Sequence, residues 1–318
     1  MTAPRVDRTA SAPGKLILAG EYAVLEGGTA VVIAVDRRAT ARAGTREPSP
    51  FLDALHAALV ARHGAEHPRA RRAAALTVDT AAFASHGRKL GLGSSAAATV
   101  AAAALALAAE GEAPDAAEVF ELAAAAHGDA QGRRGARGSG ADLAACTYGG
   151  ALAFARRGGD VSIEPLPAPR SITLLPFFTG HSADTVTLVG RVRAAGAAVA
   201  PCLDAIARAA DALASALRRD DAEAIRGAIR DGGDALAALG ERAGVDLETP
   251  AVRAARQALA PLGAAVKTTG AGGGDLAIAA LAPDADPGLA AEALARAGCE
   301  PLPLGIDLCG VDLRPQAL

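Results

Sequence analysis

Short apolar runs alternate along the chain with helical patterns, and this alternation predicts a mixed architecture. Apolar residues at helical spacing predict helices, and short apolar runs bounded by glycine, proline or polar residues predict buried strands. We expect strands at 16–19, 29–35, 76–78, 151–155, 161–163, 172–178, 264–267, 276–281 and 303–313. We expect helices at 51–63, 96–109, 115–126, 141–147, 185–198, 201–218, 221–239, 250–260 and 287–297. The predicted fold class is therefore α+β.

A cluster of prolines near the middle of the chain suggests a domain boundary. Pro165, Pro167 and Pro169 follow a predicted strand–turn–strand segment, and prolines at this density are typical of a linker. At 318 residues the chain is long enough for two domains, or for one large domain, with a full core. We predict an N-terminal domain at 1–168 and a C-terminal domain at 169–318.

A glycine-rich stretch at 91–97 runs directly into an apolar helix. It reads Gly-Leu-Gly-Ser-Ser-Ala-Ala, and serine at the head of an alanine- and leucine-rich run suits a helix N-cap. The free N–H groups and the positive end of the helix dipole would then face one point, which favours an anion. Glycines without Cβ let a phosphate approach the backbone closely. The stretch therefore predicts a phosphate-binding loop.

Other interpretations of this stretch compete. It fits a variant of the dinucleotide-binding fingerprint, but that motif needs a buried strand before it, and residues 85–89 are polar. It is not a Walker A loop, because no Gly-Lys-Ser/Thr follows. The apolar run at 96–109 is too short and too rich in alanine for a transmembrane helix. A glycine turn before an ordinary core helix remains an open alternative.

The overall composition narrows the function classes. Hydrophobic residues make up 51% of the chain and charged residues 21%, which predicts a folded core over most of its length. The net charge of −3 argues against a nucleic-acid or anionic-membrane partner. Residues 1–12 contain no apolar segment, so no signal peptide is predicted. The four cysteines lack zinc-binding spacing, and we expect free thiols in a reducing cytoplasm.

The few lysines lie beside glycine-containing stretches. Of 32 basic residues only Lys15, Lys89 and Lys267 are lysine, and the abundance of arginine reflects composition rather than function. A compact ammonium suits a phosphate oxygen or a reacting hydroxyl. Lys15 and Glu21 lie at opposite ends of one short predicted strand, so we expect the edge of a site there. The alternatives are a surface ion pair and a solvated strand end.

Three stretches together resemble the three motifs of the GHMP kinases. They are 13–21, which begins Pro-Gly-Lys, the loop at 91–97, and 269–275, which reads Thr-Gly-Ala-Gly-Gly-Gly-Asp. They occur in the family's order, and the resemblance spans essentially the whole chain. The family includes galactokinase, homoserine kinase, mevalonate kinase and phosphomevalonate kinase. The resemblance implies a two-domain α+β fold, with an N-terminal domain like the second domain of ribosomal protein S5 and a ferredoxin-like C-terminal domain.

The resemblance also implies a site for ATP and Mg²⁺. The loop would hold the ATP phosphates, and Ser94 or Ser95 would help bind Mg²⁺. The implied nucleotide-binding residues are Lys89, Gly91, Leu92, Gly93, Ser94, Ser95 and Ala96. In mevalonate kinase a second Mg²⁺ ligand is a glutamate, where this chain offers only Asp129 and Gln131. The metal site is thus half assigned.

Asp142 follows a Ser-Gly pair, where the mevalonate kinase branch has its catalytic aspartate. Such a carboxylate can accept the proton of an attacking hydroxyl, and Lys15 can hold the carboxylate or lower the pKa of the hydroxyl. The alternative is that Asp142 caps its short helix. A catalytically inactive relative that only binds or senses a ligand is a different class of function. The presence of Lys15, Ser94 and Asp142 together argues against it.

Within the family, three details resemble the phosphomevalonate kinase branch. The first motif has Gly-Glu-Tyr at 20–22 rather than Gly-Glu-His, the third ends in Asp275, and 138–145 reads Gly-Ser-Gly-Ala-Asp-Leu-Ala-Ala. The implied reaction is ATP-dependent phosphorylation of phosphomevalonate to diphosphomevalonate, on the mevalonate route to isoprenoids. Mevalonate kinase is the alternative. The aspartate at 142 argues against diphosphomevalonate decarboxylase.

An acceptor that already carries a phosphate calls for cationic groups and N–H donors. Arg133, Arg134 and Arg137 lie in a glycine-rich loop, and Ser182 and Thr185 open a predicted helix, so either could bind the phosphate. Solvated arginines in a flexible loop are the alternative. The implied substrate-binding residues are Glu21, Tyr22, Arg133, Arg134, Arg137, Ser139, Gly140, Ser182, Thr185, Gly270, Ala271, Gly272 and Gly273. We expect a small-molecule substrate as partner and a monomer or homodimer.

Overall fold

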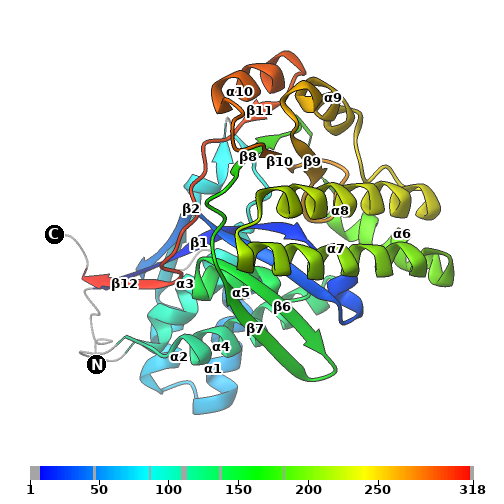
Figure 1. The fold of residues 1–318 in the computed structure, drawn as a ribbon. Coiled ribbons are helices and arrows are strands. Elements are labelled where there is room, and N and C mark those ends of the chain that lie inside the picture. The colour runs from blue at the N-terminus through cyan, green and yellow to red at the C-terminus, as the bar shows by residue number, and fades with distance from the viewer. Residues whose placement is uncertain are drawn as a thin grey trace.

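The computed structural model arranges the chain as two main β-sheets with helices packed against them (Figure 1). It describes residues 8–45, 48–85, 87–108, 113–135, 138–181 and 183–315. Within these residues all pairings between the strands are antiparallel. Helices and strands alternate along the chain, and the predicted α+β class is confirmed.

The first sheet contains the N-terminal strands and the last strand of the chain. Its order is β12-β1-β2-β6-β7, and β3 also pairs with β2. The strands are β1 (Arg8–Ala19), β2 (Thr29–Ala43), β3 (Leu76–Asp79), β6 (Ala151–Arg157), β7 (Asp160–Leu166) and β12 (Asp312–Pro315). In the β1–β2 hairpin the register shifts between Pro13 and Gly14 and again between Ile17 and Ala19. Such irregularities re-aim neighbouring side chains, and Lys15 lies between the two.

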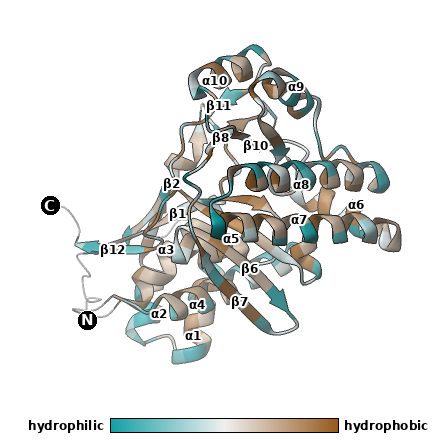
Figure 2. Cartoon of the chain, viewed as in Figure 1, coloured by the Kyte–Doolittle hydropathy of each residue, from teal (hydrophilic) through white to brown (hydrophobic). Residues whose placement is uncertain are grey.

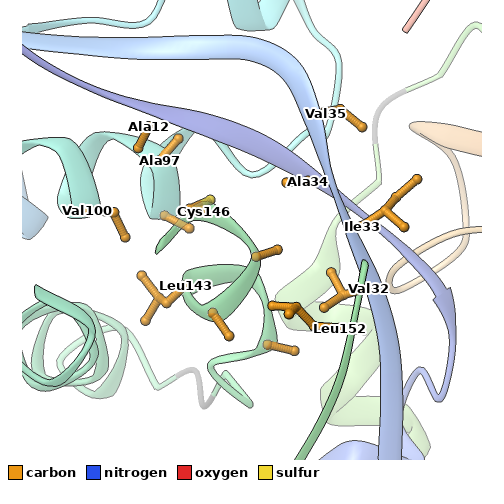
Figure 3. Packing of buried hydrophobic residues seen from close by; sticks show 14 of the residues in the cluster. Ala12, Val32, Ile33, Ala34, Val35, Ala97, Val100, Leu143, Cys146 and Leu152 are labelled. Carbon is orange, nitrogen blue, oxygen red and sulfur yellow. The ribbon is translucent and has the colours of Figure 1, made fainter. Parts of the chain in front are cut away.

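Helices rich in alanine pack directly on this sheet. α3 (Ser94–Leu107) and α5 (Ala141–Tyr148) contact β1 and β2, and around α3 pack α1 (Pro50–His63), α2 (Pro68–Ala74) and α4 (Ala116–Gly132). Figure 3 shows Ala97 of α3 close to Ala12 of β1, with Cys146 of α5 beside them. Since α3 is apolar almost all round, it is stable only as a buried helix.

The second sheet has the order β11-β8-β10-β9. Its strands are β8 (Thr173–Phe178), β9 (Ala265–Thr268), β10 (Leu276–Leu281) and β11 (Glu300–Pro301). α9 (Pro250–Leu259) precedes β9, and α10 (Pro287–Arg296) joins β10 to β11. Together they give the βαββαβ succession of a ferredoxin-like domain, as the resemblance implies.

Two long helices pack between the sheets. α7 (Ala200–Arg219) contacts β1 and β2, and α8 (Ala222–Ala243) contacts β9 and β10. Figure 2 shows hydrophilic residues along the outer sides of these helices and hydrophobic residues in the strands that they cover. Successive residues of a strand point to opposite sides, and in β10 the residues on both sides are buried. Its residues that pack with α9 and α10 are Ala277, Ala279 and Leu281, and those that join the main core are Leu276, Ile278 and Ala280.

Several helices and strands differ from the prediction. Instead of one strand at 303–313, β11 and β12 are separated by an irregular segment, which one bridge between Val35 and Ile306 ties to β2. The helix predicted to end at Ala126 continues to Gly132. The helix predicted at 185–198 is divided into α6 (Thr185–Ala194) and a 3-10 turn, because Gly196 has a φ of 58°. α2 is not evident from the hydrophobic pattern.

The proline cluster is only partly a linker. Pro165 lies inside β7, and the segment between Leu166 and Thr173 connects the two sheets. β12, however, returns to pair with β1. The boundary between 168 and 169 therefore stays a prediction.

The described residues contain no single helix that is both long and apolar enough to cross a membrane. In the part of the chain that the structure describes, one pair of helical segments, Thr185–Ala194 and Gly196–Arg219, meets the required length and composition together, across a bend of 104°. All four cysteines are free, and three of them are buried.

Candidate active site

A cavity of about 210 Å³ brings together residues of all three stretches that carry the family resemblance. It lies where β1, the loop before α3, the start of α5 and the loop before β10 meet. Of the implied nucleotide-binding residues only Gly91 lines it. Its lining includes Lys15, Glu21, Tyr22, Gly91, Ser139, Asp142, Thr185, Gly270, Ala271, Gly272 and Asp275. All of these except Asp275 belong to the set predicted from the sequence.

The loop at 91–97 opens α3 as predicted, but its cap is different. Gly93, rather than a serine, is the N-cap, and Ser94 is the first helical residue. The predicted serine cap is wrong because the N-cap backbone is left-handed, with a φ of 79° at Gly93, a conformation that favours glycine. The N–H groups of the first turn still lack intrahelical partners, which is the basis of an anion site.

The surroundings of the loop exclude the dinucleotide-binding interpretation. The residues before it form β5 (Arg88–Lys89), an exposed two-residue strand paired with β4 (Ala84–Ser85), so the buried strand of that motif is missing. The Leu92 carbonyl instead accepts a hydrogen bond from the Lys15 N–H at 2.9 Å, which ties the loop to β1. Lys89 is exposed and does not line the cavity.

We expect Gly93→Val to weaken ATP binding more than about tenfold. A left-handed backbone costs a residue with a side chain roughly 1–2 kcal/mol, and 1.4 kcal/mol corresponds to a factor of ten. A Cβ at Gly93 would also lie 2.9 Å from Lys15 Cε, inside normal contact distance. Isothermal titration with ATP would measure the effect. Gly87→Val is the control, because Gly87 also has a positive φ but no atom within 4 Å of its Cβ position. ATP binding equal to wild type in Gly93→Val would place the phosphate site elsewhere.

Lys15 and Asp142 approach the cavity from β1 and α5. Asp142 is the second residue of α5 and not its cap, and its Oδ1 accepts a hydrogen bond from the Leu143 N–H at 3.0 Å. Lys15 Nζ donates to the Gly91 carbonyl at 3.4 Å. Burial raises the pKa of the Cys146 thiol, which the charge of Asp142 raises further and that of Lys15 lowers. Both charges therefore act on the same part of the site.

Asp275 is an acidic residue of the cavity that the predicted set does not contain. It follows the third glycine stretch, and its Cβ lies 2.8 Å from the position that a Cβ on Gly91 would take. Burial raises the pKa of Asp275, while a hydrogen bond from the Ala183 N–H and the charge of Lys15 lower it. Its position at the end of the glycine motif at 269–275 is the feature of the sequence that points to this residue.

Glu21 does not form an ion pair with Lys15. It is buried, and its Oε1 binds the Nζ of Lys267, which is fully buried in β9. The neighbouring Tyr22 donates its hydroxyl to the Ala271 carbonyl at 2.6 Å. Burial raises the pKa of Tyr22, with a further contribution from the charge of Glu21. These two contacts connect the first motif to the third.

In the glycine loop at 270–274, Gly270, Ala271, Gly272 and Gly274 line the cavity, and Gly273 does not. All four of its glycines have positive φ, between 69° and 147°. A Cβ at Gly272 would lie 2.7 Å from the Leu247 carbonyl, and one at Gly273 would lie 2.7 Å from a methyl of Leu188. The loop is therefore held by close backbone packing on one side and faces the cavity on the other.

The predicted phosphate-binding arginines and serines fall in different places. Arg133 is exposed and pairs with Asp129 at 2.9 Å, and Arg134 is also exposed. Neither lines the cavity. Arg137 and Ser182 lie outside the described residues.

Ser139 and Gly140 precede α5, and Ser139 Oγ accepts a hydrogen bond from the Ala141 N–H at 3.2 Å. Thr185 lines the cavity as the first residue of α6. The N-terminus of α6 already has an anionic cap, since Asp184 accepts a hydrogen bond from the Thr187 N–H at 3.1 Å. That carboxylate would compete with a bound phosphate.

The oxygen groups near the loop fit a magnesium ion that enters with a nucleotide. Mg²⁺ keeps several waters and needs only one or two protein oxygens besides the substrate phosphates. Ser94 at the start of α3 and Asp142 at the start of α5 offer such oxygens. Asp129 is turned towards Arg133, and Gln131 accepts a hydrogen bond from the Gly138 N–H at 2.9 Å. Among the described residues no three His, Cys, Asp or Glu side chains form a metal-binding group.

A glycine-rich loop before a helix, with a lysine and a carboxylate near it, is the arrangement expected of a phosphotransferase site. The models for the GHMP kinases N terminal domain and the GHMP kinases C terminal match residues 69–150 and 213–300. A phosphomevalonate kinase of Streptomyces sp. (strain CL190) is 30% identical over 94% of this chain and 97% of its own. The chain belongs to the GHMP kinase family.

Other relatives agree with this membership. A mevalonate kinase of Aeropyrum pernix is 30% identical over 67% of this chain and 71% of its own. Among solved structures, Streptococcus pneumoniae phosphomevalonate kinase in complex with phosphomevalonate and AMPPNP superposes with a TM-score of 0.78. It covers 94% of this chain and 99% of its own at 23% identity, so it is evidence for the fold.

Proposed function

We propose that the protein transfers the γ-phosphoryl group of ATP to phosphomevalonate and forms diphosphomevalonate. The observation that carries this proposal is the cavity that Lys15 and Asp142 line together with Gly91, the first residue of the loop at 91–97. The relative that matches nearly the whole chain is a phosphomevalonate kinase, which supports this acceptor. Mevalonate kinase is the second candidate, because the relative from Aeropyrum is equally identical over a shorter region.

The site residues suit the steps of phosphoryl transfer. The N–H groups at the start of α3 would bind the phosphates of ATP, and Lys15 would neutralise charge that develops between donor and acceptor. The attacking oxygen belongs to the phosphate of the acceptor, whose second pKa is about 6. Asp142 can accept the remaining proton of that phosphate. Mg²⁺, held by Ser94 and the nucleotide, would supply further positive charge at the transferred group.

We expect a kcat/KM for phosphomevalonate that exceeds that for mevalonate by about 10²-fold. The additional phosphate gains charge-assisted hydrogen bonds of about 1.5–3 kcal/mol each, and 1.4 kcal/mol is a factor of ten. A coupled ADP-release assay across phosphomevalonate, mevalonate, homoserine and galactose measures this preference. Faster turnover of mevalonate would overturn the proposal in favour of mevalonate kinase. No ADP release with any acceptor would favour a non-catalytic relative.

A further inference from the structure

A second recess, of about 510 Å³, opens beside the candidate active site. Four residues line both cavities, so the two are continuous; they are Val24, Leu25, Gly138 and Ser139. The remaining lining comes from the turn before β2 and from the end of β6; these residues are Glu26, Gly27, Arg156, Arg157 and Gly158. No motif of the sequence points to this recess.

Arg156 is a half-buried cation without a countercharge. Its Nε is buried and makes no hydrogen bond, and within the described residues its guanidinium forms no ion pair. Arg38 and Arg69, which are also partly buried, pair with Asp307 and Glu118, whereas Arg37 likewise has a buried Nε without a hydrogen bond. Because desolvation of an unpaired charge is unfavourable, an anion that enters the recess gains more there than at a solvated arginine.

The position of Arg156 relates the recess to the reaction centre. Its Nη2 lies 3.1 Å from the position that a Cβ on Gly140 would occupy. Gly140 is the N-cap of α5, and Asp142 is the second residue of that helix. The guanidinium therefore lies close to the partial positive charge of the helix N-terminus. Glu26 is the acidic residue of the lining, and it is exposed.

We propose that Arg156 binds the carboxylate of the acceptor, the end of the molecule that does not react. This inference rests on the proposed function. The reacting phosphate has to lie beside Lys15 and Asp142, while the five-carbon main chain of the acceptor ends in a carboxylate, a second anion away from them. The recess leads away from the reaction centre past Ser139, and a guanidinium can hold a carboxylate through two parallel hydrogen bonds.

Arg157, the next residue of β6, also lines the recess and holds its opposite wall in place. Its Nε donates to the Gly27 carbonyl at 3.2 Å, which fixes the turn on the opposite side of the recess. The site is thus a positively charged niche formed by β6 and the turn before β2. It would serve mevalonate and phosphomevalonate alike, because both carry this carboxylate. The arginine therefore sets affinity for a carboxylic acid acceptor rather than the choice between these two.

The test compares Arg156→Gln with wild type on phosphomevalonate and on its neutral carboxamide analogue. We expect Arg156→Gln to raise the KM for phosphomevalonate about 10–100-fold and to leave the KM for ATP within about twofold. Wild type should discriminate against the carboxamide by a similar factor, and Arg156→Gln should lose that discrimination. Arg156→Lys should recover part of the affinity. Arg296→Gln, on the exposed face of α10, is the matched control and should change neither KM.

The outcomes separate this inference from the proposed function. Wild-type turnover of phosphomevalonate tests the function, and the comparison between acid and carboxamide tests the role of Arg156. If wild type instead uses mevalonate, the same comparison is made with mevalonate and its amide. A folded Arg156→Gln variant with unchanged acceptor KM, or one that still prefers the acid as wild type does, would overturn the inference. Thermal melting of Arg156→Gln and Arg156→Lys verifies that both variants are folded.

Discussion

Asp142→Asn is expected to fold normally and to lose at least about 10²-fold in kcat. The structure explains why the fold should persist: Asp142 does not cap α5, and its one hydrogen bond with the backbone, from the Leu143 N–H, can also be made by an amide oxygen. The amide cannot accept the proton of the attacking group. The coupled ADP-release assay with phosphomevalonate measures the loss, and circular dichroism checks the fold.

Asp211→Asn is the matched control for this experiment. Asp211 is exposed on α7 and does not line the cavity, so its variant should retain wild-type kcat. Turnover of Asp142→Asn within a few-fold of wild type would contradict the assignment of Asp142 as the base.

Lys267→Met should reduce the free energy of unfolding by about 3–5 kcal/mol. Lys267 is fully buried, and its removal leaves Glu21 buried without a countercharge. Two glycines of α8 pack closely against this lysine. A Cβ on Gly232 would lie 3.8 Å from Lys267 Cε, and one on Gly233 would lie 3.0 Å from Lys267 Cβ. Urea unfolding followed by circular dichroism measures the change.

The double variant Glu21→Met/Lys267→Met distinguishes an unpaired charge from a packing defect. Replacing both members of a buried pair by apolar residues is often neutral, so the double variant should recover most of the lost stability. A single variant within about 1 kcal/mol of wild type would show that the pair contributes little to the fold. A double variant as unstable as the single one would assign the loss to packing around β9.

Most helices and strands are predictable because each one buries a periodic apolar pattern. The exceptions have physical reasons. β12 pairs with a strand some 300 positions earlier in the chain, a long-range contact that no local pattern contains. The segment between β11 and β12 is apolar enough to suggest a strand, but it makes a single bridge to β2 instead of a ladder. α2 contains three arginines among seven residues, which hides its short buried side.

The site was predictable where a motif carries it and not where the tertiary fold builds it. The glycine loops, Lys15 and Asp142 are read from local sequence, and the structure places Lys15, Asp142, Gly91 of the first loop and most of the second loop around one cavity. The partner of Glu21 is 246 residues away along the chain, so the sequence suggested the nearer Lys15 instead. Arg156 is one of many arginines. A buried Nε without a hydrogen-bond partner is also found at Arg37, Arg226 and Arg256, so it is its place in the recess that distinguishes Arg156. Lys89 is predicted to bind nucleotide because it precedes the glycine loop, yet it lies on an exposed hairpin.

The return of β12 to β1 makes the C-terminal sheet an insertion within the first domain. Two connecting segments run between the sheets, one after β7 and the other after β11. A single proteolytic cut in either crossing would therefore leave both halves attached through native contacts. Cutting after Leu166 would not release the first domain intact, because the strand that completes its edge, at Asp312–Pro315, is on the other fragment. From this topology we expect the two fragments, expressed separately and mixed, to associate through the β1–β12 pairing.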